Sequence, residues 1–180
     1  MKHNLMLFLL LSVLPFNGHA AAQDDGPELS GIKMGVGLSV TFDWEKRIES
    51  ASVVNGIVRV DSEKNAVARI LLESHYLFTP NKRLLGVQEP GTWGIGPFVG
   101  VMSGNDRLIE AAGIGAMLGF RRSKDKDNSF NIGVGYMVDP SSRTLGDGII
   151  ANHPLPQGES GVRYKTRSRG GIVVMASFSF

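Results

Sequence analysis

The chain has 180 residues, with 19 Lys and Arg against 17 Asp and Glu, which gives a formal net charge of +2, and it contains no cysteine. This near-neutral balance gives no reason to expect a nucleic-acid partner. The lack of cysteine excludes disulfides and the attachment of a lipid to an N-terminal cysteine.

Residues 1–20 have the layout of a secretory signal peptide, because Lys2 precedes an apolar stretch that small residues follow. The apolar stretch is shorter than the ~20 residues of a transmembrane helix, and Pro15 interrupts it. We therefore predict export with cleavage after Ala20 or Ala22, rather than a membrane anchor.

The rest of the chain is predicted to form one domain. Residues 21–30 are polar and turn-forming, and we interpret them as a flexible leader. Residues 31–180 are enough for a single domain with an interior. No apolar run in them reaches the ~20 residues of a spanning helix, which excludes helical membrane insertion but leaves a membrane-inserted β-barrel open.

Apolar residues alternate with small or polar ones at several places in this domain, and period two is the period of a β-strand. The clearest case is residues 32–44, where each even position is apolar and each odd position is Lys, Gly, Ser, Thr or Asp. The other candidate strands, in chain order, are residues 50–61, 66–78, 92–103, 108–121, 129–139, 144–152 and 162–180.

The face opposite the bulky residues consists mostly of Gly, Ser and Asn. Glycine weakens an ordinary strand, so its concentration on one face needs a spatial reason. The interior of a narrow closed barrel supplies that reason, while the bulky face meets lipid and aromatic residues near the strand ends form interfacial girdles. The predicted fold class is therefore all-β: a closed antiparallel up-and-down transmembrane β-barrel of about eight strands.

The connections alternate in length. Short turns are predicted at residues 61–65, 104–107 and 139–143, and longer charged loops at residues 45–50, 79–91, 122–128 and 151–161. This alternation puts the short turns and both termini in the periplasm and the longer loops outside. The loop at residues 79–91 is then the best candidate for a contact surface.

The seventh strand is the least regular. An even strand count needs a strand at residues 144–152, although the alternation there is poor. A rival prediction places this strand at residues 162–166, with a hairpin at 167–170. We favour one long final strand, because its alternation runs without a phase break from Val162 to Ile172.

The final strand carries apolar residues at alternate positions up to the last residue of the sequence. These positions are Phe180, Phe178, Ala176, Val174 and Ile172. In this pattern the chain resembles the small outer-membrane β-barrel proteins of Gram-negative bacteria, which commonly end in Phe preceded by alternating aromatic and apolar residues. The resemblance implies localisation in the outer membrane and recognition of these five residues by the barrel-assembly machinery.

The expected function is non-catalytic, a structural or surface-interaction role of a monomer among outer-membrane lipids and lipopolysaccharide, without cofactor or metal. One alternative is a lipid A-modifying enzyme, suggested by the sequence Glu73-Ser74-His75. Neighbouring residues on a strand point to opposite faces, which separates Ser74 from the other two, whereas a nucleophile and its base must meet. The other alternative is a soluble periplasmic β-barrel that carries an apolar ligand, with its large apolar residues inside.

Two groups of polar residues are candidate sites. Inward-facing charges in a narrow lumen persist only when paired, so we expect a network that fills the lumen rather than a channel lining. Its members are Arg59, Arg69, Glu73, His75, Arg121 and Asn131. Four basic residues near the outer end of the last strand either bind lipopolysaccharide phosphates around the rim or pair with Asp43, Glu45 or loop carboxylates. They are Arg163, Lys165, Arg167 and Arg169.

Overall fold

The computed structural model describes residues 28–180 apart from residues 87, 105 and 106. The predicted signal peptide and residues 21–27 of the predicted leader lie outside the described residues. Glu28, which we also assigned to the leader, begins the first strand. In the described part of the chain, no helix is long and apolar enough to cross a membrane.

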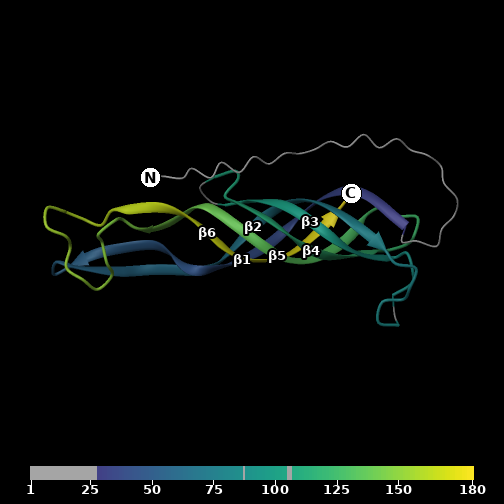
Figure 1. The fold of residues 1–180 in the computed structure, drawn as a ribbon, viewed down its shortest axis with the longest axis horizontal. Coiled ribbons are helices and arrows are strands. Elements are labelled where there is room, and N and C mark those ends of the chain that lie inside the picture. The colour runs from purple at the N-terminus through teal and green to yellow at the C-terminus, as the bar shows by residue number, and fades with distance from the viewer. Residues whose placement is uncertain (1–27, 87, 105–106) are drawn as a thin grey trace, which may run out of the picture.

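Six antiparallel strands form one sheet that closes on itself (Figure 1). Strands that follow one another in the chain are neighbours in the sheet, and the last strand pairs with the first. The predicted all-β antiparallel arrangement is confirmed. The strands are β1 (Glu28–Val54), β2 (Ile57–Thr79), β3 (Trp93–Ser103), β4 (Ala111–Arg121), β5 (Ser129–Leu145) and β6 (Tyr164–Ser179).

The described residues contain six strands, so the prediction of about eight is wrong. The predicted strand at residues 50–61 is a hairpin instead, because Val54 pairs with Ile57 across Asn55 and Gly56. These two residues have φ values of 51° and 76°, the left-handed conformation that a two-residue hairpin turn requires. The segments predicted as a loop at 45–50 and a turn at 61–65 therefore lie inside the long strands β1 and β2.

The predicted seventh strand at residues 144–152 is also absent from the structure. β5 ends at Leu145, and residues 146–163 form turns and irregular chain. The predicted turn at residues 139–143 lies inside β5, where a register shift between Asp139 and Ser142 marks an irregularity. β6 runs unbroken from Tyr164 to Ser179, so the long final strand is confirmed and the rival hairpin at 167–170 is wrong.

Fewer strands change which end of the sheet each loop occupies. Only two strands precede the loop at residues 79–91, not three, so it lies at the same end as β1's start and β6's end. The prediction that it faces away from the termini is therefore wrong. The opposite end carries the hairpin turn at Asn55, the β3–β4 connection and the long β5–β6 connection.

The strands differ greatly in length, and this divides the molecule into two parts. Pairing between β1 and β6 stops at Asp43↔Gly171, and pairing between β2 and β3 starts at Ile70↔Ser103. The part in which all six strands pair is called the ring below. Beyond it, β1–β2 and β5–β6 continue as two hairpins, which project to the left in Figure 1. This second part, residues 44–69 and 139–170, is called the hairpin extension.

The hairpin extension has its own apolar core. Val58, Leu145 and Ile149 are buried there, and partly buried residues such as Tyr164 pack against them. The hydroxyl of Tyr164 accepts a hydrogen bond from the amide of Ala51 at 2.8 Å and donates one to its carbonyl oxygen at 3.1 Å. The two hairpins are thus packed against each other by side chains from both.

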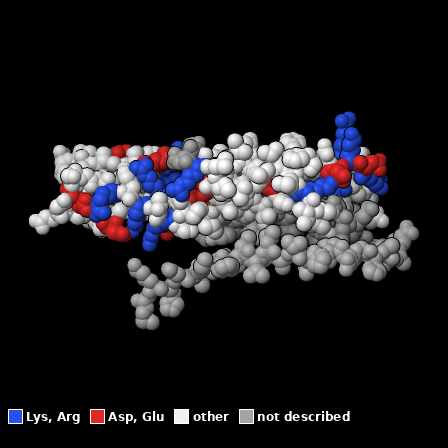
Figure 2. Space-filling view, turned by 90° about the horizontal axis from the view of Figure 1, so that it is seen from above, with Lys and Arg blue, Asp and Glu red and all other residues white. Residues whose placement is uncertain are grey.

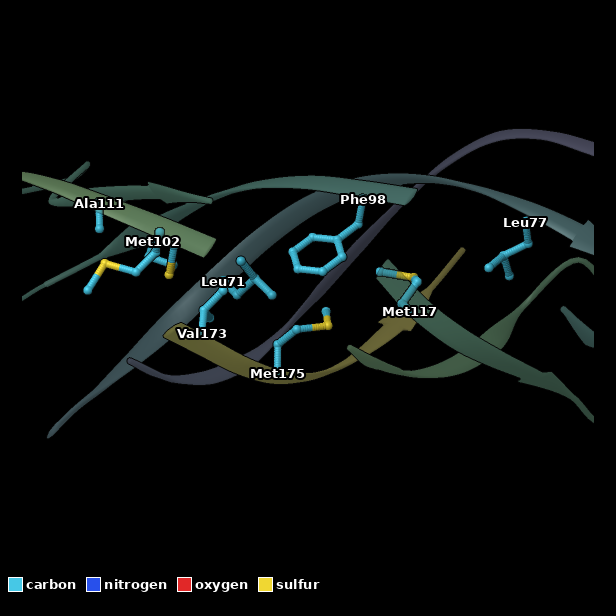
Figure 3. Close-up of a cluster of buried hydrophobic side chains, with 9 residues drawn as sticks. Leu71, Leu77, Phe98, Met102, Ala111, Met117, Val173 and Met175 are labelled. Carbon is cyan, nitrogen blue, oxygen red and sulfur yellow. The ribbon is translucent and has the colours of Figure 1, made fainter. Parts of the chain in front are cut away.

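The bulky residues of the alternating pattern face outward from the ring. Ile32, Leu38 and Trp44 are 79%, 69% and 68% exposed. The interior differs from the prediction of small and polar side chains, because apolar ones fill its middle (Figure 3). These are Leu71, Leu77, Phe98, Met102, Ala111, Met117, Met137, Val173 and Met175. Glycine makes room for them, since a β-carbon at Gly133 would lie 2.6 Å from the Met175 sulfur.

Candidate functional sites in the lumen and at its rim

One polar cluster lies inside the ring, centred on a buried carboxylate. Glu73 and His75 occupy successive inward positions of β2, and Glu73 Oε2 lies 2.8 Å from His75 Nδ1. Ser177 of β6 donates a hydrogen bond to Glu73 Oε1 at 2.8 Å. Gly35 of β1 creates the space, because a β-carbon there would overlap the Glu73 carboxylate.

Further hydrogen bonds extend this cluster toward the end of the ring that carries the last residues of β6. Asn131 donates through Nδ2 to Ser177 Oγ at 3.2 Å and accepts from Ser129 Oγ at 2.7 Å. The amide of Ser129 in turn donates to Ser179 Oγ at 3.1 Å. The chain of contacts satisfies most of these buried polar atoms, although His75 Nε2 has no hydrogen-bond partner among the described residues.

The contacts of this cluster do not join Ser74 to His75. Ser177 contacts the carboxylate of Glu73 rather than the imidazole of His75. Ser74 donates to the carbonyl oxygen of Lys33 at 3.3 Å, while Glu73 and His75 are buried inside. The strand therefore places Ser74 on the opposite side of the sheet from Glu73 and His75, as the alternation predicts. What the arrangement does is pair a buried carboxylate with His75 of its own strand and Ser177 of β6.

A second cluster, of charged residues, lies where the ring meets the hairpin extension. Arg69 Nη2 donates to Asp139 Oδ2 at 3.0 Å, and its Nε lies 3.5 Å from Glu110 Oε2. Arg47 is bonded to the same oxygen of Asp139, and lies 3.3 Å from Glu110 and 3.5 Å from Asp43. The side chains of Asp43, Arg69 and Asp139 have no exposed surface. Charges this deeply buried require such partners.

Sequence reasoning found only part of this second cluster. The sequence predicts Arg69 for the lumen network, but it does not predict Arg47, Glu110 or Asp139. Arg47 and Asp139 fall in segments predicted as a loop and a turn, and Glu110 lies in the connection before β4. The missing signal is the continuation of β1 and β5 beyond the ring, which brings these residues together from positions far apart in the chain.

The remaining residues predicted for the lumen are at its ends or outside it. Arg59 is exposed on the hairpin extension, with Nη1 donating to Asn152 Oδ1 at 2.8 Å. Arg121 ends β4 and is half-buried, and its amide donates to the carbonyl oxygen of Thr92 at 2.7 Å. The structure therefore brings Glu73, His75 and Asn131 into one cluster and Arg69 into the other. Arg59 and Arg121 belong to neither cluster.

The alternating residues of the last strand lie on the outer surface. Phe178 and Phe180 are 65% and 72% exposed, and Ile172, Val174 and Ala176 are also exposed. The ring of Phe178 lies 5.1 Å from that of Phe130 on β5.

The four basic residues of β6 and the segment before it have different surroundings. Arg163 is paired with Glu159, and Lys165 with Asp147. The hydrogen bond and charge of Lys165 hold the pKa of Asp147 below its ordinary value. Arg169 Nη1 donates to the carbonyl oxygen of Glu45 at 2.8 Å, and its Nη2 lies 3.6 Å from the Glu45 carboxylate.

In the described ranges, no three His, Asp or Glu side chains are grouped in a way that could hold a metal ion. No family model, no curated protein and no solved structure matches the chain.

Proposed function

We propose that the protein is a non-catalytic transmembrane β-barrel of the outer membrane of a Gram-negative bacterium, exported by the predicted signal peptide. In this proposal the ring spans the bilayer with a filled lumen, and the hairpin extension projects from the membrane as a structural or interaction surface. The observation that carries the proposal is the outward apolar face of the closed sheet.

The dimensions of this apolar face support the proposal. β1 and β6 pair over nine residues each, from Gly35↔Ser179 to Asp43↔Gly171, and β3 and β4 have 11 residues each. A membrane-spanning strand needs about 9–11 residues. Figure 2 shows, on one face, a band of mostly uncharged side chains between two zones where Lys, Arg, Asp and Glu gather. A closed sheet also leaves no unpaired edge in the bilayer.

The alternative of a soluble carrier is less well supported. A carrier of an apolar ligand needs an interior cavity, but Phe98, Met117 and Met175 occupy the middle of the ring. It also needs a polar outer surface, whereas Leu38 is 69% exposed. The same filled interior favours a barrel that does not conduct ions.

The proposal is tested with a charge placed on either part of the outer surface. Val174 lies on the outer face of the ring, where an arginine costs about 2–4 kcal/mol if that face meets the bilayer midplane. We expect wild type and Val174→Ile to fractionate with the outer membrane and to migrate differently before and after heating on a gel. Val174→Arg should lose most of its outer-membrane yield.

A matched control is Thr166→Arg, since Thr166 is exposed on the hairpin extension and should tolerate a charge. A soluble periplasmic protein without a heat-dependent shift would overturn the proposal, as would wild-type yield of Val174→Arg. Addition or removal of acyl chains on lipid A by purified protein would instead support the enzymatic alternative.

A further inference from the structure

The hairpin extension and the ring are joined at a fork in the sheet. β1 and β6 pair side by side up to Asp43↔Gly171 and then separate, because β1 continues with β2 and β6 with β5. The fork leaves a cleft of about 330 Å³. Its walls are formed by Trp44, Glu45, Arg167, Ser168, Arg169 and Gly170.

Two guanidinium groups line this cleft. Arg169 is 8% exposed and is held in place by hydrogen bonds from Nη1 to the carbonyl oxygens of Glu45 and Lys46. Its Nε is buried without a hydrogen-bond partner among the described residues. Arg167 is exposed, and no carboxylate of the described chain lies within 4 Å of it. Guanidinium groups bind phosphate oxygens in a planar, bidentate geometry.

One carboxylate shares the cleft with them. Glu45 is 71% exposed, and its Oε2 lies 3.6 Å from Arg169 Nη2, at the edge of the range of an ion pair. A long contact to an exposed carboxylate contributes little and leaves Glu45 free to turn away. The cleft therefore offers one cation without a close counter-charge and a second whose counter-charge is loosely held.

The position of the cleft relative to the apolar face indicates its ligand. Trp44 is the last of the alternating outward residues of β1, is 68% exposed, and has its ring 5.4 Å from that of Tyr136. Tryptophan and tyrosine gather at the boundary between the hydrocarbon and the headgroups of a membrane. Arginine just beyond that boundary lies at the level of lipid phosphates.

We propose that this cleft binds the phosphate of a membrane-lipid headgroup in the leaflet on the side of the hairpin extension, a site that rests on the proposed membrane-spanning function. The lipid's acyl chains lie along the apolar face below Trp44, and its phosphate accepts hydrogen bonds from Arg167 beside the positive charge of Arg169. A phosphate monoester fits best, because its second negative charge matches two guanidinium groups.

Tryptophan fluorescence tests the site directly. The chain has two tryptophans, Trp44 in the cleft and Trp93, whose Nε1 is bonded to Lys82 at the other end of the ring. The Trp93→Phe variant therefore reports on Trp44 alone. The full chain is placed in phosphatidylcholine nanodiscs that contain increasing fractions of brominated phosphatidic acid, or of brominated phosphatidylcholine as the comparison. We expect phosphatidic acid to reach half-maximal quenching at a several-fold lower fraction.

Variants in the same background assign the preference to the cleft. Arg167→Gln should raise the half-quenching fraction of phosphatidic acid about fivefold, and Glu45→Gln should lower it. Arg59→Gln is the matched control, an exposed arginine of the hairpin extension outside the cleft, and it should change nothing. A heat-dependent gel shift verifies that each variant is folded.

Each other outcome contradicts a defined part of the proposal. Equal quenching by the two brominated lipids, or an unchanged preference in Arg167→Gln, would overturn the headgroup site while leaving the membrane-spanning function intact. Loss of the preference on addition of millimolar inorganic phosphate would show a site for free phosphate instead. Absence of quenching by either lipid would overturn the membrane-spanning function, and this site with it.

Discussion

At the scale of single residues, the narrow ring depends on glycine where neighbouring strands and side chains approach closely. A β-carbon at Gly37 would overlap the carbonyl oxygen of Ala176 on β6, and one at Gly96 would overlap that of Tyr76 on β2. Backbone cannot rotate away as a side chain can. These glycines therefore let the wall of a six-stranded ring close, and the ones facing Leu77, Phe98 and Met175 let its interior fill.

Gly37→Ala tests this dependence. Because the new β-carbon meets backbone, β1 and β6 must move apart, and overpacking of this kind costs about 1–3 kcal/mol. We expect a lower urea midpoint for unfolding from detergent micelles. Gly161→Ala is the matched control, since nothing lies within 4 Å of a β-carbon there, and its midpoint should stay that of wild type. An unchanged midpoint in Gly37→Ala would mean that the strands tolerate a wider spacing.

At the scale of elements, the sequence predicts the faces of the strands better than their ends. The alternation at residues 32–44 assigns inward and outward positions correctly, since Ser39, Thr41 and Asp43 are buried and their neighbours are exposed. The assignment succeeds because one face of this strand is buried inside the ring and the other is exposed along residues 32–44. The continuous alternation of the last strand predicts β6 for the same reason.

The alternation does not predict the strand ends, because strands of the hairpin extension carry polar residues on both faces, unlike those of the ring. Arg47 pairs with Lys64 and Ser52 with Arg59 in the register of β1 and β2, so polar residues occur on either face. Such segments look like loops in the sequence. The Asn55-Gly56 dipeptide is a strong hairpin signal, but Val53, Val54, Ile57 and Val58 flank it and continue the apolar pattern of a strand. As a turn, it predicts the two strands that the structure has before residue 80.

Tyr164→Phe tests whether the two hairpins of the extension hold each other. The variant removes the hydrogen bonds with the amide and the carbonyl oxygen of Ala51, each worth about 0.5–1.5 kcal/mol, while the ring of residue 164 stays in the apolar core. We expect faster proteolysis and faster amide hydrogen exchange in residues 44–69, with the heat-dependent gel shift of the ring unchanged.

Arg83→Gln is a suitable control for this variant, because Arg83 pairs with Glu89 on the surface at the other end of the molecule. It should leave exchange in residues 44–69 at the wild-type rate. If Tyr164→Phe also leaves that rate unchanged, the apolar contacts of Val58, Leu145 and Ile149 alone hold the hairpins together.

At the scale of the whole molecule, the ring and the hairpin extension share strands and meet at the buried charged cluster. Its members come from β1, β2, β5 and the β3–β4 connection. The cluster closes the lumen on the side of the extension, while Glu73 and its partners occupy the interior nearer the termini. Apolar side chains lie between the two clusters and fill the rest of the interior of the ring. The extension is therefore joined to the ring by buried ion pairs as well as by continuous strands.

The pair Arg69–Asp139 is the centre of this junction, and a double-mutant cycle measures it. Removing one partner of a buried ion pair costs about 3–5 kcal/mol, because the other charge is left in the interior. We expect Arg69→Met and Asp139→Asn each to lower the free energy of unfolding in detergent micelles by about 3 kcal/mol, since Arg47 still pairs with Asp139 in the first and Glu110 still lies near Arg69 in the second.

The double variant should lose less than the sum of the two single losses, by at least about 1 kcal/mol, because it leaves no unpaired charge from this pair. The exposed pair Lys46–Glu63 serves as the comparison, and Lys46→Met should cost no more than about 1 kcal/mol. Additive losses would mean that Arg69 and Asp139 are stabilised separately by Arg47, Glu110 and Asp43. In that case the stabilisation of the junction would be spread over several ion pairs. The contact between Arg69 of β2 and Asp139 of β5 would not dominate it.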